Sequence, residues 1–190
     1  MNAVETWFCG SPFWRYVTRR QILPWILQGS ELGEHVLELG AGPGAATEAL
    51  GQLATRVTSL EYDRAFAARL GARASGTNAF AIQGDAAELP FADGTFSSAI
   101  AILMLHHLRS RELQDRAFAE IYRILRPGGV FLALEIEDGW LHRAGHIRST
   151  FVPVAPASAF VRLTTAGFSK VTVDFRRGGF RIRALRAREG

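Results

Sequence analysis

The stretch Glu38-Leu-Gly-Ala-Gly-Pro-Gly-Ala45 decides the fold of this chain. It overlaps the apolar run His35-Val-Leu-Glu-Leu39, which predicts a buried strand, and leads into residues 45–54, which predict a helix. Glycines let the backbone pass close to a ligand, and the first amides of a helix can bind it. The stretch also satisfies the dinucleotide fingerprint, with Ala45 in the third position, so the glycines alone do not identify the ligand.

Strand-like and helix-like segments alternate on the carboxyl side of this loop. Further strands are predicted at residues 56–61, 79–83, 96–105 and 130–135, with helices at 64–72 and 111–125 between them. This alternation predicts a parallel sheet with helices on both faces. The chain ends differently, because residues 170–175 and 180–185 alternate as half-buried strands and only four residues join them. So short a connection forces an antiparallel hairpin.

Three acidic residues at or near the ends of these strands indicate the kind of ligand. Glu38 is the charged residue of an otherwise apolar strand, where it would repel a pyrophosphate and attract an ammonium group. Glu61 ends the second strand, 21 residues after Gly40, where a carboxylate can bind ribose hydroxyls. Asp85 follows the third strand and suits the adenine amine. Ammonium, ribose and adenine without phosphate describe S-adenosylmethionine, unless Glu38 simply pairs with an arginine.

Several motifs resemble those of the class I S-adenosylmethionine-dependent methyltransferases, and the type 11 group most closely. Val36-Leu-Glu-Leu-Gly-Ala-Gly-Pro-Gly44 is similar to motif I, and Glu61 matches the acidic end of the second strand. Further matches are Gly84-Asp85-Ala86, Leu105-His-His-Leu108 and Leu125-Arg-Pro-Gly-Gly-Val130, so the resemblance covers about residues 35–137. It implies an α/β fold, a Rossmann-like three-layer sandwich whose seven-stranded sheet has the order 3-2-1-4-5-7-6 with strand 7 antiparallel.

The resemblance also implies a set of cofactor-binding residues. The glycines would line the methionine and ribose, Glu38 would lie near the methionine end, Glu61 would bind the ribose, and Asp85 and Ala86 would bind the adenine. The expected residues are Glu38, Gly40, Ala41, Gly42, Gly44, Glu61, Tyr62, Asp85, Ala86 and Leu103. One position departs from the family pattern: Ser97 stands where an aspartate is common, which we interpret as the loss of one supporting carboxylate.

Length and composition predict a single cytoplasmic domain. The 190 residues are expected to divide into an N-terminal helical lid (1–30), a cofactor-binding core (35–137), and an acceptor-side loop with the terminal hairpin (138–190). The longest apolar run, residues 99–105, is far shorter than the roughly 20 residues of a membrane span, and no secretory signal is recognisable. The single cysteine, Cys9, excludes an internal disulfide framework and a multi-cysteine zinc site.

Positive charge is concentrated at the end of the chain. Residues 1–140 hold 12 basic and 16 acidic side chains, whereas residues 141–190 hold 10 basic and 2 acidic ones. These arginines are expected to protect an edge strand from aggregation, because no aromatic residues alternate with them as a nucleic-acid stacking surface requires. A patch for RNA or an acidic protein is the alternative.

No residue is a decisive catalyst, and methyl transfer needs a base only if the acceptor starts protonated. His106, His107 and Glu135 are candidates, because they follow the fourth strand or end the fifth. No metal is expected, since His142 and His146 have helical ligand spacing but no acid completes a site. Cys9 lies far along the chain from the fourth-strand loop, which argues against a cysteine nucleophile.

The predicted function is methyl transfer from S-adenosylmethionine to a small-molecule acceptor at oxygen, nitrogen or carbon. There are three alternatives: RNA or protein methylation by the basic C-terminal face, an NAD-dependent oxidoreductase, and a non-catalytic cofactor-binding module. Glu38, Asp85 and the terminal hairpin argue against the NAD-dependent oxidoreductase. The early aromatic residues are expected to pack on the sheet or to wall an acceptor pocket that is open or completed by a second subunit. These aromatic residues are Trp7, Phe8, Phe13, Trp14, Tyr16 and Trp25.

Overall fold

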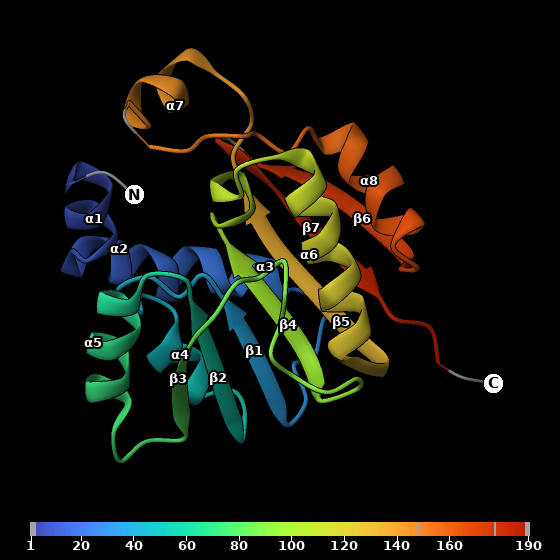
Figure 1. The fold of residues 1–190 in the computed structure, drawn as a ribbon, viewed down its shortest axis with the longest axis horizontal. Helices are drawn as coiled ribbons and strands as arrows, with labels where there is room; N and C mark the ends of the chain where they lie inside the picture. The colour runs from blue at the N-terminus through green and yellow to red at the C-terminus, as the bar shows by residue number, and fades with distance from the viewer. Residues whose placement is uncertain (1–2, 148, 177, 189–190) are drawn as a thin grey trace.

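A seven-stranded mixed sheet lies at the centre of the computed structural model, which describes residues 3–147, 149–176 and 178–188 (Figure 1). The strand order is β3-β2-β1-β4-β5-β7-β6, and β7 runs antiparallel to both β5 and β6, so the predicted topology is confirmed. The strands are β1 (His35–Leu39), β2 (Arg56–Glu61), β3 (Ala79–Gln83), β4 (Phe96–Ile102), β5 (Leu125–Glu135), β6 (Ser169–Arg176) and β7 (Gly179–Leu185).

Helices cover both faces of the sheet and make the three-layer arrangement. On one face α3 (Leu23–Leu27), α4 (Thr47–Gly51) and α5 (Arg64–Ala74) contribute to one hydrophobic cluster. On the other face α6 (Arg111–Ile124) and α8 (Pro156–Thr165) contribute to a second cluster. The remaining helical segments are α1 (Ala3–Cys9), α2 (Pro12–Val17), the π-helical segment η1 (Thr18–Ile22), the 3-10 segment η2 (Leu105–His107) and α7 (Trp140–Gly145).

Side chains alternate between the two clusters along each central strand, as the pleat of a strand requires. In β1, Val36 belongs to the cluster beneath α3 and α4, whereas Leu37 and Leu39 belong to the cluster beneath α6. Both faces of β1 are therefore buried, which explains why its sequence is almost continuously apolar.

Several predicted boundaries were wrong: β5 begins at Leu125 rather than at residue 130, α4 ends at Gly51 and α5 ends at Ala74. Two further corrections shape the functional end of the sheet. The strand expected to reach residue 105 stops at Ile102, and the chain turns at Leu103, whose φ is 53°. The Leu105 amide then donates to Glu135 at the end of β5, which holds the turn in place. The helix expected from residue 45 begins at Thr47, because residues 42–46 form the turns of the glycine loop.

Ser97, which replaces the aspartate common in the resembling family, keeps a structural role at the start of β4. Its hydroxyl oxygen accepts the His35 amide at 3.0 Å and lies 2.8 Å from the carbonyl oxygens of Leu32 and His35. A serine can both donate and accept at this point, so it ties the entry of β1 to β4 without a carboxylate.

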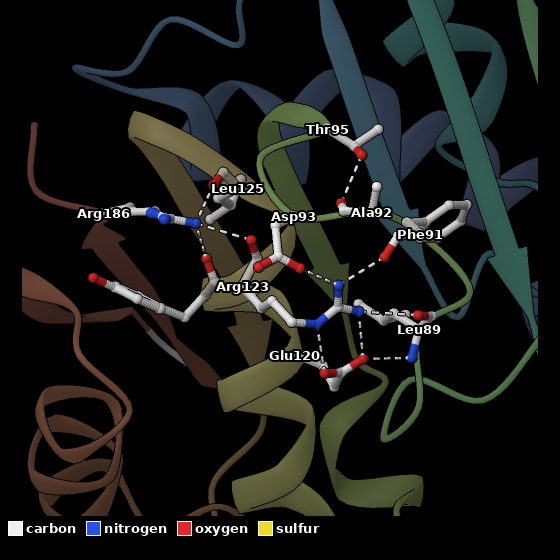
Figure 2. A network of polar contacts seen from close by, with 10 residues as sticks. Leu89, Phe91, Ala92, Asp93, Thr95, Glu120, Arg123, Leu125 and Arg186 are labelled. Carbon is white, nitrogen blue, oxygen red and sulfur yellow. Dashed lines mark hydrogen bonds and ion pairs between the residues drawn. The ribbon is translucent and has the colours of Figure 1, made fainter. Parts of the chain in front are cut away.

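The C-terminal arginines are used within the fold. Arg186 donates from one nitrogen to three carbonyls at the end of α6, those of Tyr122, Arg123 and Leu125, at 3.1, 2.8 and 2.7 Å (Figure 2). Figure 2 also shows the neighbouring Arg123, which binds Glu120, Asp93 and two loop carbonyls. A cation at the carboxyl end of a helix compensates its unpaired carbonyls.

Two further arginines of β7 attach the hairpin to the N-terminal segment. Arg181 pairs with Asp174 at 2.9 Å and donates to the Trp25 carbonyl, and Arg183 donates to the Ser30 hydroxyl. The prediction that these arginines protect an edge strand was wrong for Arg181 and Arg183, because β7 lies between β5 and β6. Their contacts within the fold weaken the case for a nucleic-acid surface.

No helix within the described residues has both the length and the apolar character needed to cross a membrane.

We expect Arg186→Ala to lower the free energy of unfolding by about 1–2 kcal/mol, because the three carbonyls lose a charged donor. Urea unfolding followed by circular dichroism measures this change. Arg188→Ala, at an exposed position of the same segment, is the matched control and should leave stability unchanged. Equal effects of the two variants would contradict a specific capping role for Arg186.

Candidate functional site

A cavity of about 490 Å³ lies at the carboxyl ends of the central strands. Its walls come from the loops after β1, β2, β3 and β4, from the first two helices with the following π-helical segment, and from Thr150. Ligands of open α/β sheets bind at this edge, where the strand order changes direction between β1 and β4. Nine of the ten expected cofactor-binding residues line the cavity: Glu38, Gly40, Ala41, Gly42, Glu61, Tyr62, Asp85, Ala86 and Leu103.

Gly44, the tenth, does not belong to the cavity lining found for the described residues. Its φ is +80°, and a Cβ atom there would lie 2.5 Å from Leu70 Cδ1 and 2.7 Å from the Arg73 guanidinium. The positive φ favours glycine here, and the ends of the Leu70 and Arg73 side chains of α5 pack directly over it. By contrast, a Cβ atom on Gly42 would meet nothing within 4 Å, so the loop is open at the position where a ligand would approach.

Glu38 is a buried carboxylate without a basic partner in the described ion pairs, so the arginine pair considered above is wrong. One of its oxygens accepts hydrogen bonds from the hydroxyls of Thr47 and Ser59, both at 2.6 Å. Burial raises the pKa of Glu38 to about 7, although the two hydroxyls oppose the shift. A cationic ligand would favour its charged form.

The two other acids are fixed by backbone amides. Glu61 accepts the Gly42 amide at 2.7 Å and the Asp63 amide at 2.8 Å, so it joins the glycine loop to the end of β2. Asp85 accepts the Ala87 amide at 2.8 Å. These bonds hold both carboxylates in place on the cavity wall, and each oxygen can still accept from a ligand.

His106 and Glu135 form a buried pair beside the cavity. His106 Nδ1 lies 2.5 Å from Glu135 Oε2, and the other oxygen of Glu135 accepts the Leu105 amide at 2.7 Å. Glu135 is fully buried, so its position supports a role in orienting His106 rather than contact with an acceptor.

His107 is the candidate histidine that lines the cavity. Its Nδ1 atom lies 3.1 Å from the Thr150 carbonyl. Burial lowers its pKa to about 4, so the ring is neutral near pH 7 and is a weak base.

Cys9 also lines the cavity, although its distance along the chain predicted otherwise. Helix α1 folds back over the carboxyl ends of the strands and brings it there. Burial, together with the nearby Glu5, raises the pKa of the thiol to about 11. The thiolate is the nucleophilic form, so Cys9 is unreactive near neutral pH because its thiol stays protonated. Its distance from the fourth-strand loop along the chain is not the reason.

The N-terminal aromatic residues divide into two groups. Trp14 lines the cavity with Thr18, whose buried hydroxyl has no hydrogen-bond partner among the described residues. Trp7, Phe13 and Tyr16 are instead mostly exposed. Sequence reasoning identified Trp14 but missed Thr18, which lies one helical turn further along the same face.

Comparison with known proteins identifies the family. A family described as "Methyltransferase domain", of type 11, matches residues 37–133, just over half of the chain. This chain therefore belongs to the S-adenosylmethionine-dependent methyltransferases, and S-adenosylmethionine is the cofactor of the family.

Curated relatives share the cofactor-binding part. A probable S-adenosylmethionine-dependent methyltransferase of Mycolicibacterium smegmatis is 36% identical over 100 residues, which cover 53% of this chain and 37% of that protein. A demethylmenaquinone methyltransferase of Thermobifida fusca is 36% identical over 107 residues, covering 54% and 44%. The match thus spans less than half of either relative.

Solved structures share the fold. An S-adenosylmethionine-dependent methyltransferase of Aquifex aeolicus superposes with a TM-score of 0.76 at 15% identity, covering 98% of this chain and 100% of that one. Phosphoethanolamine N-methyltransferase 2 of Haemonchus contortus, in complex with S-adenosyl-L-methionine, superposes with a TM-score of 0.75 at 14% identity, covering 91% and 53%.

The raised pKa of Glu38 makes a prediction about stability. In the unfolded chain Glu38 has the ordinary carboxyl pKa, whereas in the folded protein its pKa is about 7. Burial of Glu38 therefore costs little stability at pH values below the ordinary carboxyl pKa, and this cost grows as the pH rises towards and through 7. We expect Glu38→Gln to stabilise the ligand-free protein by about 2 kcal/mol more at pH 8 than at pH 5, measured by urea unfolding. Glu48→Gln, an exposed position in α4, is the control; parallel pH profiles of all three proteins would contradict the prediction.

Proposed function

We propose that the protein transfers the methyl group of S-adenosylmethionine to a small, largely apolar acceptor. The observation that carries the proposal is one continuous cavity, whose walls combine the family's cofactor motifs with side chains that the motifs do not include. The latter come from the N-terminal helices, from Leu113 of α6 and from Thr150, so they are available to recognise an acceptor.

The cavity residues fit the cofactor by their chemistry. Glu38 is a buried carboxylate with no cationic partner among the described residues, and it would hold the ammonium group of the methionine portion. Glu61 would accept from the ribose hydroxyls, and Asp85 would accept from the adenine amine. Gly42 offers an open backbone approach, and Thr18 offers a buried hydroxyl that has no hydrogen-bond partner among the described residues.

The acceptor is proposed to lie against the lining that the acids and the glycine loop do not form. That lining includes Trp14, His107, Leu108, Leu113 and Thr150. This wall is apolar apart from a few polar groups, which is typical of sites for small organic ligands. Residues 1–30 are proposed to act as its lid.

The bound cofactor supplies an electrophilic methyl group on a sulfonium, so that attack by the acceptor forms a bond to carbon while the carbon–sulfur bond breaks and its electron pair stays on sulfur. The chain's own contribution is alignment: the acids and glycine loop hold one reactant, and the apolar wall holds the other. A proton lost by the acceptor passes to solvent, because His107 has too low a pKa to retain it near pH 7.

The names of two relatives favour an apolar acceptor. One acts on demethylmenaquinone, and another is a sterol methyltransferase-like protein of Botryococcus braunii, 37% identical over 108 residues. Both acceptor classes are ring compounds of low polarity, which agrees with the apolar lining proposed for the acceptor here. RNA and protein acceptors are disfavoured because Arg181, Arg183 and Arg186 are engaged within the fold.

Cofactor binding is tested by calorimetric titration with S-adenosylhomocysteine and, separately, with NADH. We expect micromolar binding of S-adenosylhomocysteine and none of NADH. Glu61→Gln should weaken binding by about 10-fold or more, because it removes the charge that accepts the ribose hydroxyls.

Glu48→Gln, on an exposed surface of α4, is the matched control for the loss of one charge. Circular dichroism verifies that each variant is folded. Binding of NADH alone, or of neither ligand by folded protein, would overturn the proposed function.

Acceptor class is tested with a donor that carries a radiolabelled methyl group. We expect label in the organic extract when hydroquinones or phenols are supplied, at a rate that changes little with salt. Label in RNA or protein, with a rate that falls steeply as salt rises, would instead establish the macromolecular alternative.

A further inference from the structure

Three histidines that are distant in the sequence meet beside the cavity. His106 and His107 lie in η2, directly after β4, whereas His146 follows the last residue of α7. Figure 1 shows α7 and its loop at the top of the molecule, near the start of α6. One ring nitrogen of each histidine lies within 4.8 Å of the others.

Hydrogen bonds orient the three rings in the same way. Each Nδ1 atom faces an acceptor oxygen: Glu135 Oε2 at 2.5 Å from His106, the Thr150 carbonyl at 3.1 Å from His107, and the His142 carbonyl at 2.7 Å from His146. Each Nδ1 is therefore placed to carry a proton, and in a neutral ring this leaves Nε2 with its lone pair. Metal-bound histidines are commonly oriented by such carboxylate or carbonyl partners.

The Nε2 atoms of His106 and His146 are 3.3 Å apart. Two neutral imidazoles protonated at Nδ1 would point lone pairs at each other across this distance, which is unfavourable unless a cation lies between them. Zinc–nitrogen bonds of about 2.0–2.1 Å in tetrahedral geometry separate two ligand nitrogens by about 3.3–3.4 Å. The observed spacing is that of two ligands on one ion.

Two carboxylates supply the charge that a divalent ion needs in a buried place. Glu135 is fully buried, and among the described residues its ion pair is with His106. Glu5, in α1, has one carboxylate oxygen 3.8 Å from His146 Nε2, and its other oxygen accepts from Ser149. A buried carboxylate such as Glu135 is costly without a nearby positive charge.

We propose that His106, His107 and His146 bind one divalent transition-metal ion of the zinc class through their Nε2 atoms, with the fourth position facing Glu5. Imidazole ligands suit zinc, copper and nickel, whereas magnesium and calcium prefer oxygen. The helical spacing of His142 and His146 did not indicate this site, because the partners of His146 come from η2.

The ion would reinforce three segments that hydrogen bonds already connect. These are α1 through Glu5, the loop after α7 through His146, and the segment after β4 through the other two histidines. Because His107 also lines the cavity, the ion would fix the wall against which the acceptor is proposed to lie. Binding of the ion itself does not depend on the proposed methyl transfer.

The test uses the full chain without a histidine tag, stripped of metal by EDTA dialysis. We expect one Co²⁺ per chain, with the visible absorption of a tetrahedral site, and one Zn²⁺ that displaces it. His146→Ala and His146→Phe should each weaken Zn²⁺ affinity by about 100-fold or more, measured against a chromophoric chelator. Glu135→Gln, which keeps all three ligands, should weaken it by about 10-fold or more.

His142→Ala is the matched control, since this half-buried histidine lies one helical turn from His146 and outside the cluster. It should bind Zn²⁺ as the unaltered protein does. His146→Phe retains an aromatic ring to pack against Phe151, 4.5 Å away, so at least one variant should keep the fold. Thermal denaturation with and without Zn²⁺ should show a rise in midpoint for the unaltered protein and none for the His146 variants.

Two results would overturn the proposal. One is the absence of stoichiometric Co²⁺ and Zn²⁺ binding by folded protein, which would mean that the imidazoles share a proton instead. The other is Zn²⁺ binding by the His146 variants that equals that of the unaltered protein. Both are measured without S-adenosylhomocysteine. A failure here is therefore distinguishable from a failure of the proposed function, which the separate titration of that ligand detects.

Discussion

The parallel pairing of β1 with β2 and β4 is the constraint on which the rest of the structure depends. It brings the carboxyl ends of three strands to one edge, where the chain must turn away and leave a space. Glu38, Glu61 and the turn at Leu103 all lie there because of this pairing. The hydrogen bond from the Gly42 amide to Glu61 then joins the loop after β1 to the end of β2, so the cavity wall is built by the sheet itself.

Burial gives the polar groups at this edge their different properties. Glu38 and His107 are displaced from their ordinary pKa values in opposite directions, because burial disfavours the charged form of each. Both are thereby neutral more often near pH 7 than their free counterparts are. A cationic ligand would reverse this tendency at Glu38. The same reasoning explains why Cys9, although it lies on the cavity wall, is kept as an unreactive thiol.

Segments from the second half of the chain assemble the layers and complete the edge of the sheet beside the site. Arg186 caps α6 and Arg181 holds the N-terminal segment against β7, so the positive charge of the C-terminal region is largely used to assemble the layers. The loop after β5 carries His146 back to the end of β4, where it meets His106. The family motifs form the carboxyl edge of the sheet, and the loop after β5, which lies outside those motifs, completes it.

The sequence by itself determined the alternation of strands and helices and the terminal hairpin, because these depend on local patterns such as apolar runs and glycines at turns. The strand order and the proposed cofactor-binding residues came instead from the family resemblance that its motifs carry. Gly44 was predicted to bind the cofactor, but it is absent from the cavity lining of the described residues and lies beneath the Leu70 and Arg73 side chains of α5, a contact that no local pattern encodes. Tertiary structure alone decided that Cys9 and Thr18 reach the cavity and that His146 joins His106 and His107. Such meetings depend on how helices and loops fold back over the sheet, and the distance between residues along the chain carries no information about them.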